Sequence, residues 1–192
     1  MNTSTHTPSP SGAVAPLSRA AARPVSSEPA QYLTFMLGGE TFAIGILAIK
    51  EIIEYQSLTA VPMMPECVRG VINLRGAVVP VMDLQARFGR PSSPITKRTC
   101  IVIVEVRAQT EDGPEGQVIG VLVDAVNEVI DIAPGEVEPP PAFGARIRTD
   151  FMQGMGKVKG KFVILLDVDQ VFSLDDIAQL AALAPEAQAA ME

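Results

Sequence analysis

Few residues in this chain have the type and spacing that catalysis requires. The single histidine, His6, lies in an N-terminal stretch rich in Pro, Ser, Thr and Ala, which excludes Ser-His-Asp and Cys-His arrangements and most zinc sites. Asp167 and Asp169 alternate within an apolar run, which on a strand would point them to opposite faces and make a poor acid–base pair. The residues favour a binding protein over an enzyme.

Two further patterns resemble reactive sites but fail on spacing. Residues 154–161 are rich in Gly and Lys, yet a phosphate-binding loop needs Ser or Thr after its lysine, and Phe162 stands there instead. Cys67 and Cys100 could form a disulfide, bind metal or act as nucleophiles, but they are far apart and neither belongs to a C-x-x-C pair. We interpret them as buried, inert thiols in a reducing cytosol, and we expect no cofactor and no metal ion.

Three polar residues, Glu51, Asn73 and Arg75, stand within otherwise apolar, strand-like surroundings. One interpretation is a solvated strand face or an internal ion pair, which at an exposed site contributes only about 0.2–1 kcal/mol. The other is a protein interface, because Arg at the edge of an apolar patch is a frequent anchor whose truncation can cost about 2 kcal/mol or more. From residue type alone, both interpretations remain open.

The segments that hold these residues come in two copies. Residues 70–83 return in degenerate form as 154–167, and residues 42–53 return as 119–130. The matched positions include Gly70 with Gly154, Gly76 with Gly160, Arg75 with Lys159, Asp83 with Asp167, Phe88 with Phe172 and Glu51 with Glu128. Two matched segments in the same order indicate two copies of one supersecondary unit, because a solenoid would need about three copies or more.

Short apolar runs divided by Gly and Pro predict β-strands in both copies. The runs at residues 32–37, 41–44, 46–53, 99–106 and 117–123 predict strands, with a hairpin turn at Gly38-Gly39 and a polar loop at 107–116. Residues 46–53 also fit a helix, but their β-branched side chains favour a strand. About five short strands in each half protect their edges best by curling into a small barrel, so we expect two barrels side by side.

The repeated glycines and aspartates are interpreted as parts of the scaffold. At Gly70 and Gly76 we expect a left-handed turn or a close backbone contact that a Cβ atom would obstruct. We expect Asp83, matched by Asp167, to tie a strand end to neighbouring amides rather than to act in catalysis.

Composition suggests three parts in the chain. Residues 1–30 are expected to be a disordered tail, because they cannot bury enough apolar surface to offset chain entropy. Residues 31–173 are expected to form one domain of two intertwined barrel subdomains, roughly 31–95 and 96–173. Residues 174–192 are expected to form a C-terminal helix and tail, since Ser173 begins a capping pattern; this helix would cover a barrel edge or mouth, or dock a partner.

Charge and hydropathy exclude two classes of partner. The net charge of −7 and the pI near 4.8 argue against binding a phosphate backbone, and two Tyr with no Trp disfavour an OB-like nucleic-acid binder. No run of about 18 uncharged apolar residues occurs, so we expect no direct membrane insertion.

Residues 69–84, with the motif Asn73-Leu74-Arg75-Gly76, closely resemble the signature of the CheW family of bacterial chemotaxis coupling proteins, and the similarity runs from about residue 31 to residue 172. The resemblance implies an all-β fold with minor helix, in which two five-stranded, SH3-like barrels share a hydrophobic junction. It implies a non-catalytic adaptor in the cytoplasm, recruited to membrane-associated receptor arrays. The expected partners are the regulatory domain of the histidine kinase CheA and the cytoplasmic tip of methyl-accepting chemotaxis receptors.

By position, the resemblance also assigns partner-binding residues. Arg75 and Glu51 match positions implicated in receptor or kinase coupling, and Ile49, Gly70 and Asn73 are expected on the same binding surfaces.

Departures from the family pattern at Gly45, Ile53-Glu54 and Gln85 concern partner specificity rather than the fold. The alternative within the class is a CheW-like scaffold of a non-flagellar chemosensory pathway. A small β-barrel enzyme is the alternative from another class.

Overall fold

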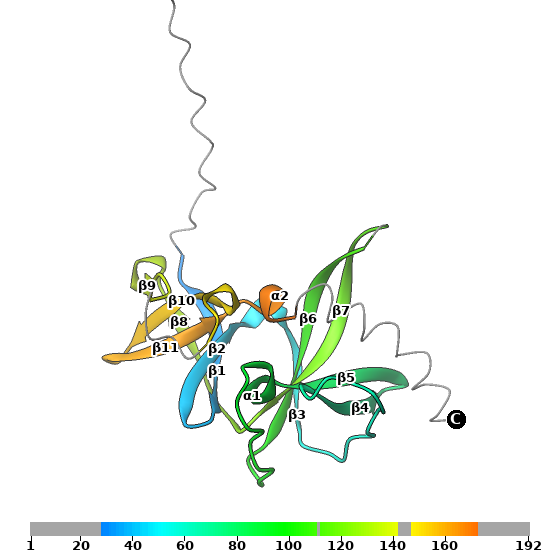
Figure 1. The fold of residues 1–192 in the computed structure, drawn as a ribbon. Helices are drawn as coiled ribbons and strands as arrows, with labels where there is room; N and C mark the ends of the chain where they lie inside the picture. The colour runs from blue at the N-terminus through cyan, green and yellow to red at the C-terminus, as the bar shows by residue number, and fades with distance from the viewer. Residues whose placement is uncertain (1–27, 111, 142–146, 173–192) are drawn as a thin grey trace, which may run out of the picture.

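The computed structural model describes residues 28–110, 112–141 and 147–172, and strands dominate this part of the chain. They form two sheets that lie side by side in Figure 1, with the one-turn helices α1 (Leu84–Arg87) and α2 (Val168–Val171) between them. Sheet A has the order β8 (Ala125–Ile132), β1 (Ala30–Leu37), β2 (Glu40–Gly45), β11 (Lys161–Leu166), β10 (Met152–Val158) and β9 (Val137–Glu138). Sheet B has the order β3 (Ile49–Glu54), β6 (Cys100–Thr110), β7 (Gly113–Val123), β5 (Ala77–Asp83) and β4 (Val68–Leu74).

The fold class predicted from the sequence is confirmed. Each sheet contains the five strands that the repeat relates, and the two-residue β9 extends sheet A to six. Three 3-10 turns complete the described elements: η1 (Ile46–Ala48), η2 (Pro134–Glu136) and η3 (Thr149–Phe151). The C-terminal helix expected at 174–192 lies outside the described residues, as does the tail expected at 1–30 except for its last three residues, of which Ala30 already begins β1.

Each repeat supplies strands to both sheets. The parallel pairing at the centre of each sheet shows this equivalence: Leu165 pairs with Ala43 in sheet A, and Val81, the repeat counterpart of Leu165, pairs with Gly120, the counterpart of Ala43. In the first repeat β1 and β2 join sheet A and β3, β4 and β5 join sheet B, and the second repeat does the reverse. The ranges 31–95 and 96–173 therefore mark the repeats, and the division near residue 95 does not separate the two sheets.

The main core lies between the sheets. Because side chains alternate along a strand, β6 directs Ile101 and Ile103 into a cluster within sheet B, and Val102 and Val104 into the junction with sheet A. Phe35 of β1 is fully buried in the same junction cluster. Strands that are apolar on both faces therefore join two sheets around one shared junction, as the family resemblance implied.

Two boundaries predicted from the sequence are wrong. Residues 46–48 form the 3-10 turn η1, which carries the chain from sheet A to sheet B, so the strand predicted at 46–53 begins only at Ile49. The loop predicted at 107–116 is shorter, because β6 and β7 continue their pairing to Thr110 and Gly113. Backbone hydrogen bonds extend this hairpin whatever the polarity of its side chains. The polar residues at 107–116 were therefore a poor guide to where the strands end.

The prediction for the repeated aspartates is confirmed in both copies. Asp83 Oδ1 accepts hydrogen bonds from the amides of Gln85 (2.9 Å) and Ala86 (3.4 Å), and Asp167 Oδ1 accepts from those of Asp169 (3.1 Å) and Gln170 (3.3 Å). Each aspartate thus caps the helical turn that follows its strand. The expectation that Asp167 and Asp169 alternate on one strand is wrong, because α2 begins between them at Val168.

Candidate partner-binding surfaces

The first candidate surface is the two-residue turn that joins β4 to β5. Arg75 and Gly76 have φ values of 52° and 85°, the left-handed pair that matches the twist of a hairpin. The side-chain Oδ1 of Asn73 accepts a hydrogen bond of 2.9 Å from the amide of Gly76. Asn73 therefore fixes the turn from within, and the turn projects Arg75 outward with 77% of its side chain exposed.

Glu51 meets Arg75 from the opposite edge of sheet B. The guanidinium donates two parallel hydrogen bonds of 2.8 Å, from Nη1 to Oε1 and from Nη2 to Oε2 of Glu51. Because β3 and β4 are the two edge strands of the sheet, this contact joins edges that the strand order separates. The bridge between Thr59 and Val71, with reciprocal backbone bonds of 2.9 Å, closes the same side of the sheet.

The pair is well oriented but is expected to contribute little to stability. With Arg75 mostly exposed, its contribution to folding is expected to be about 0.2–1 kcal/mol. A bidentate pair nevertheless holds the guanidinium in one orientation, and only two of its five N–H groups are engaged by Glu51. The remaining donors can bind a carboxylate or carbonyl of a partner with little further ordering of the side chain.

The structure does not place all five predicted residues on this surface. Arg75, Glu51 and Asn73 lie together, whereas Ile49 is half-buried and packs against the junction core. Gly70 is buried at φ 147°, and a Cβ atom there would lie 2.5 Å from the carbonyl oxygen of Thr59. Glycine is therefore needed at position 70 because the backbone of Thr59 lies too close for a Cβ atom, as the repeat had suggested.

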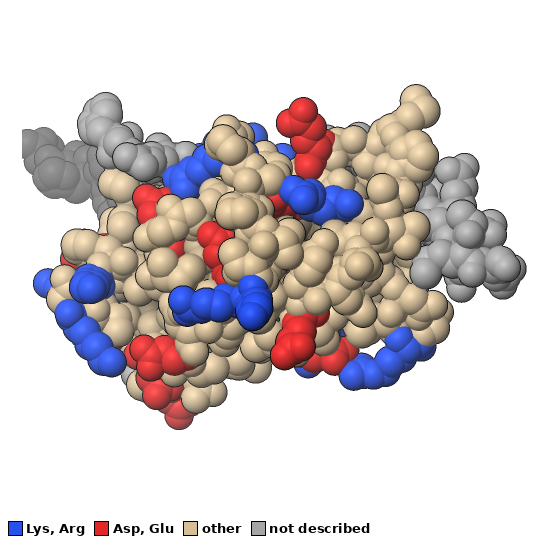
Figure 2. Space-filling model, turned by 90° about the horizontal axis from the view of Figure 1, so that it is seen from below, with Lys and Arg blue, Asp and Glu red and all other residues tan. Residues whose placement is uncertain are grey.

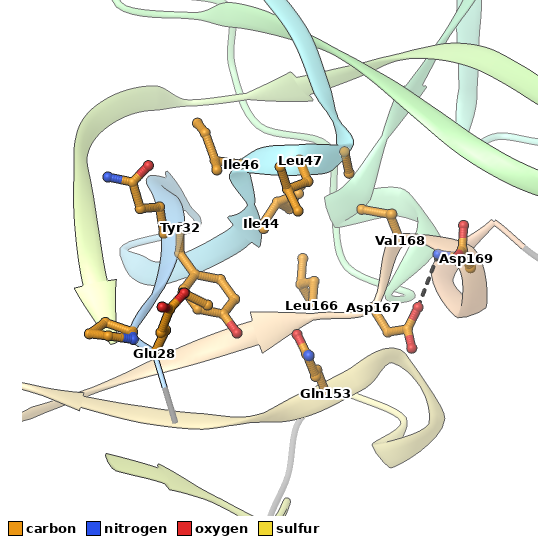
Figure 3. Close-up of a pocket in the computed structure, with 15 residues that line it drawn as sticks. Glu28, Tyr32, Ile44, Ile46, Leu47, Gln153, Leu166, Asp167, Val168 and Asp169 are labelled. Carbon is orange, nitrogen blue, oxygen red and sulfur yellow. Dashed lines mark hydrogen bonds between the residues drawn. The ribbon is translucent and has the colours of Figure 1, made fainter. Parts of the chain in front are cut away.

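The second candidate surface is a groove of about 590 Å³ that sequence reasoning missed. It is lined by residues of β1, β2, η1, β10, β11 and α2, and Figure 3 shows Tyr32, Ile44, Leu47 and Leu166 along it, with Glu28 at one end and Asp169 at the other. Leu47 of η1 is 99% exposed, which is unusual for so large an apolar side chain. Burial raises the pKa of the Tyr32 hydroxyl above its ordinary value. No local signal in the sequence marks the groove, because an apolar run such as 46–48 equally fits a strand that is buried on both faces.

Within the described residues, no group of three or more His, Cys, Asp or Glu side chains is arranged to hold a metal ion. Cys67 and Cys100 form no disulfide within the described residues. Both are half-buried and pack against the junction core, so the prediction of buried thiols is only partly right. No helix in the described part of the chain is long and apolar enough to span a bilayer. On the face in Figure 2, basic and acidic side chains are interspersed rather than gathered by sign.

Comparison with known proteins places this arrangement in a family. A CheW-like domain model matches residues 31–176. The chemotaxis protein CheW of Rhizobium meliloti is 30% identical over 156 residues, which cover 81% of this chain and 96% of that protein, and CheW of Klebsiella aerogenes is 28% identical over 148 residues, covering 77% and 84%. The crystal structure of the scaffolding protein TtCheW from Thermoanaerobacter tengcongensis superposes with a TM-score of 0.68 at 34% identity, covering 81% of this chain and 95% of that one. The duplicated sheets, the Asn-Leu-Arg-Gly turn and these similarities together show that the chain belongs to the CheW-like family.

Proposed function

We propose that the chain is a non-catalytic chemotaxis adaptor that couples methyl-accepting receptors to the histidine kinase CheA in membrane-associated arrays in the cytoplasm. The observation that carries this proposal is the bidentate Arg75–Glu51 pair, held on a left-handed turn at the position of the family motif. A residue that stabilises the fold so little, yet is so well oriented, is better explained by partner binding.

Two surfaces are needed for an adaptor, and the chain offers two that share no residue. The Arg75–Glu51 surface is polar and lies where the two edge strands of sheet B, β3 and β4, approach each other. The groove beside Leu47 is largely apolar and takes its walls mainly from sheet A. A receptor and a kinase can each occupy one surface with modest affinity, because linked contacts within an array raise the effective concentration of each partner.

The runner-up function is a CheW-like scaffold of a non-flagellar chemosensory pathway. It uses the same two surfaces and differs only in which receptor and kinase the chain meets. Binding measurements against partners encoded beside this chain distinguish the two functions.

The decisive experiment is calorimetric titration of the purified chain with a CheA regulatory domain and with a receptor cytoplasmic fragment, separately and together. Arg75→Glu and Leu47→Asp are the test variants, and Lys159→Glu, at the equivalent turn of sheet A, is the matched control. We expect simultaneous binding, with each test variant weakening one partner by about tenfold or more and the control weakening neither. Binding of neither partner by the native chain would contradict the proposal.

A further inference from the structure

Helix α1 belongs to the β4–β5 hairpin of sheet B, but its side chains bind elements of sheet A. Arg87 Nε donates a hydrogen bond of 3.0 Å to the carbonyl oxygen of Val171 at the end of α2. The Arg87 guanidinium also lies over the ring of Phe151, 5.0 Å from its centroid. Just after α1, the ring of Phe88 stacks on that of Phe42 at a centroid distance of 5.9 Å and packs at a tilt against that of Phe151 at 6.0 Å.

The contact joins equivalent positions of the two repeats. Val171 lies 84 residues after Arg87, the same separation that relates Asp167 to Asp83, so the two helical turns meet at corresponding residues. Such a contact is expected where a pseudo-twofold axis passes between the repeats, as it is in an isologous dimer. The side chains differ, however: one repeat supplies an arginine, and the other supplies the free carbonyl at the end of a helix.

Through these contacts α1 and Phe88 reach two of the elements that line the groove. Val168 and Asp169 of α2 line the groove one turn before Val171. Phe42 lies on β2, whose following residues continue directly into η1 and Leu47. Helix α1 and the Phe88 that follows it thus contact α2 and β2, two of the segments that line the groove.

A polar contact of the same segment supports this role. Just beyond α1, Arg90 is only 19% exposed and donates a 2.8 Å hydrogen bond to Glu40 at the start of β2. Gln85 is buried directly against Gly38 in the β1–β2 turn, where a Cβ atom on Gly38 would collide with the Gln85 amide. The segment from Gln85 to Arg90 therefore contacts the β1–β2 hairpin of sheet A as well as α2.

We infer that Arg87 is a positioning residue for the groove: it holds α2 against sheet B and so fixes the wall that Val168 and Asp169 form. Its effect on affinity rests on the proposed function, since it requires that a partner occupies the groove. Its effect on the wall itself does not depend on any partner.

The test is amide hydrogen exchange on the full chain, comparing Arg87→Ala with the native protein. We expect exchange of the α2 amides of Gln170 and Val171 to rise about tenfold, with the amides of β6 and β7 unchanged. Arg87→Lys, which keeps a charged donor, should restore much of the protection. Arg148→Ala is the matched control, because Arg148 also lies over the Phe151 ring, at 5.2 Å, but is exposed and paired with Asp150.

Titration of the same variants then measures the consequence for binding. Arg87→Ala should weaken the partner that Leu47→Asp weakens, by about fivefold, and leave the partner that depends on Arg75 unchanged. Unchanged exchange in α2, or an equal rise in α2 and in sheet B, would overturn the inference. If the native chain bound neither partner, the proposed function would fail, while the exchange pattern would still decide the role of Arg87. If Arg87→Ala folds poorly, Arg87→Met, which keeps the apolar stem but has no donor for Val171 O, takes its place with the same expected rise in α2 exchange.

Discussion

The turn between β4 and β5 and its counterpart between β10 and β11 have the same backbone and different chemistry. Arg75-Gly76 has φ values of 52° and 85°, and Lys159-Gly160 has 50° and 77°. In sheet B the arginine forms a bidentate pair with Glu51, whereas no ion pair among the described residues joins Lys159 to Glu128, the repeat counterpart of Glu51.

This difference distinguishes the features that the fold requires from those that it does not. Both turns need a left-handed pair of residues to match the twist of the strands, so the glycines are set by the fold. The fold does not require an ion pair, because the same hairpin is built without one in sheet A. The Arg75–Glu51 pair is therefore the part of the duplicated unit that we assign to partner recognition.

The largest expected effect on stability is at Gly70, where the two copies of the strand differ in backbone conformation. Gly70→Ala would place a Cβ atom 2.5 Å from Thr59 O on a backbone at φ 147°, and we expect it to destabilise the protein by about 3 kcal/mol or more. Chemical denaturation measures the change. Gly45→Ala, which meets no atom within 4 Å, serves as the control and should cost less than about 1 kcal/mol.

Replacement of either capping aspartate should destabilise the protein, and the loss should be larger at Asp83 than at Asp167. Asp83 is 2% exposed and also lies 3.4 Å from Arg69, so Asp83→Ala removes a cap and leaves a partly buried arginine without this partner. We expect a loss of about 2 kcal/mol, against about 1 kcal/mol for Asp167→Ala. Thermal unfolding of the two variants provides the comparison, and equal losses would show that burial of the cap does not matter.

The Arg75–Glu51 pair itself should contribute little to stability. A double-mutant cycle with Arg75→Ala and Glu51→Ala should give a coupling energy of about 0.5 kcal/mol in the free energy of unfolding, falling further in high salt. A coupling energy well above about 1 kcal/mol would instead show that the pair stabilises the contact between the two edge strands of sheet B.

The smallest effect is expected at Lys159. Lys159→Ala keeps a non-glycine residue in the same left-handed turn and removes no ion pair with a described residue, so the free energy of unfolding should change by less than about 0.5 kcal/mol. A larger loss in thermal unfolding would show that the sheet A turn depends on its lysine.

Much of the fold could be predicted because its signals are local. The strands follow apolar runs, the turn at Arg75-Gly76 follows its glycine, and the caps at Asp83 and Asp167 follow the side-chain chemistry of strand ends. The repeat predicted two equivalent units, and an ion pair of Arg75 with a carboxylate was one of the two interpretations that residue type left open.

The rest depends on contacts between segments far apart in sequence. Nothing local indicates that β2 pairs with β11, or that Arg87 meets Val171, since both contacts arise only when the repeats exchange strands. The groove was missed for the same reason, because residues from six elements line it. Leu47 belongs to an apolar run that resembles a strand but forms the turn η1, which begins after Gly45.

The most direct test of the account is the affinity of Arg75→Ala and Lys159→Ala for the CheA regulatory domain and for the receptor fragment, measured under the same conditions as the native chain. The account predicts that Arg75→Ala weakens one partner by about tenfold or more, while Lys159→Ala changes neither by more than about twofold. Native affinity in both variants, or an equal loss in both, would contradict the claim that only one of the two turns has been specialised for binding.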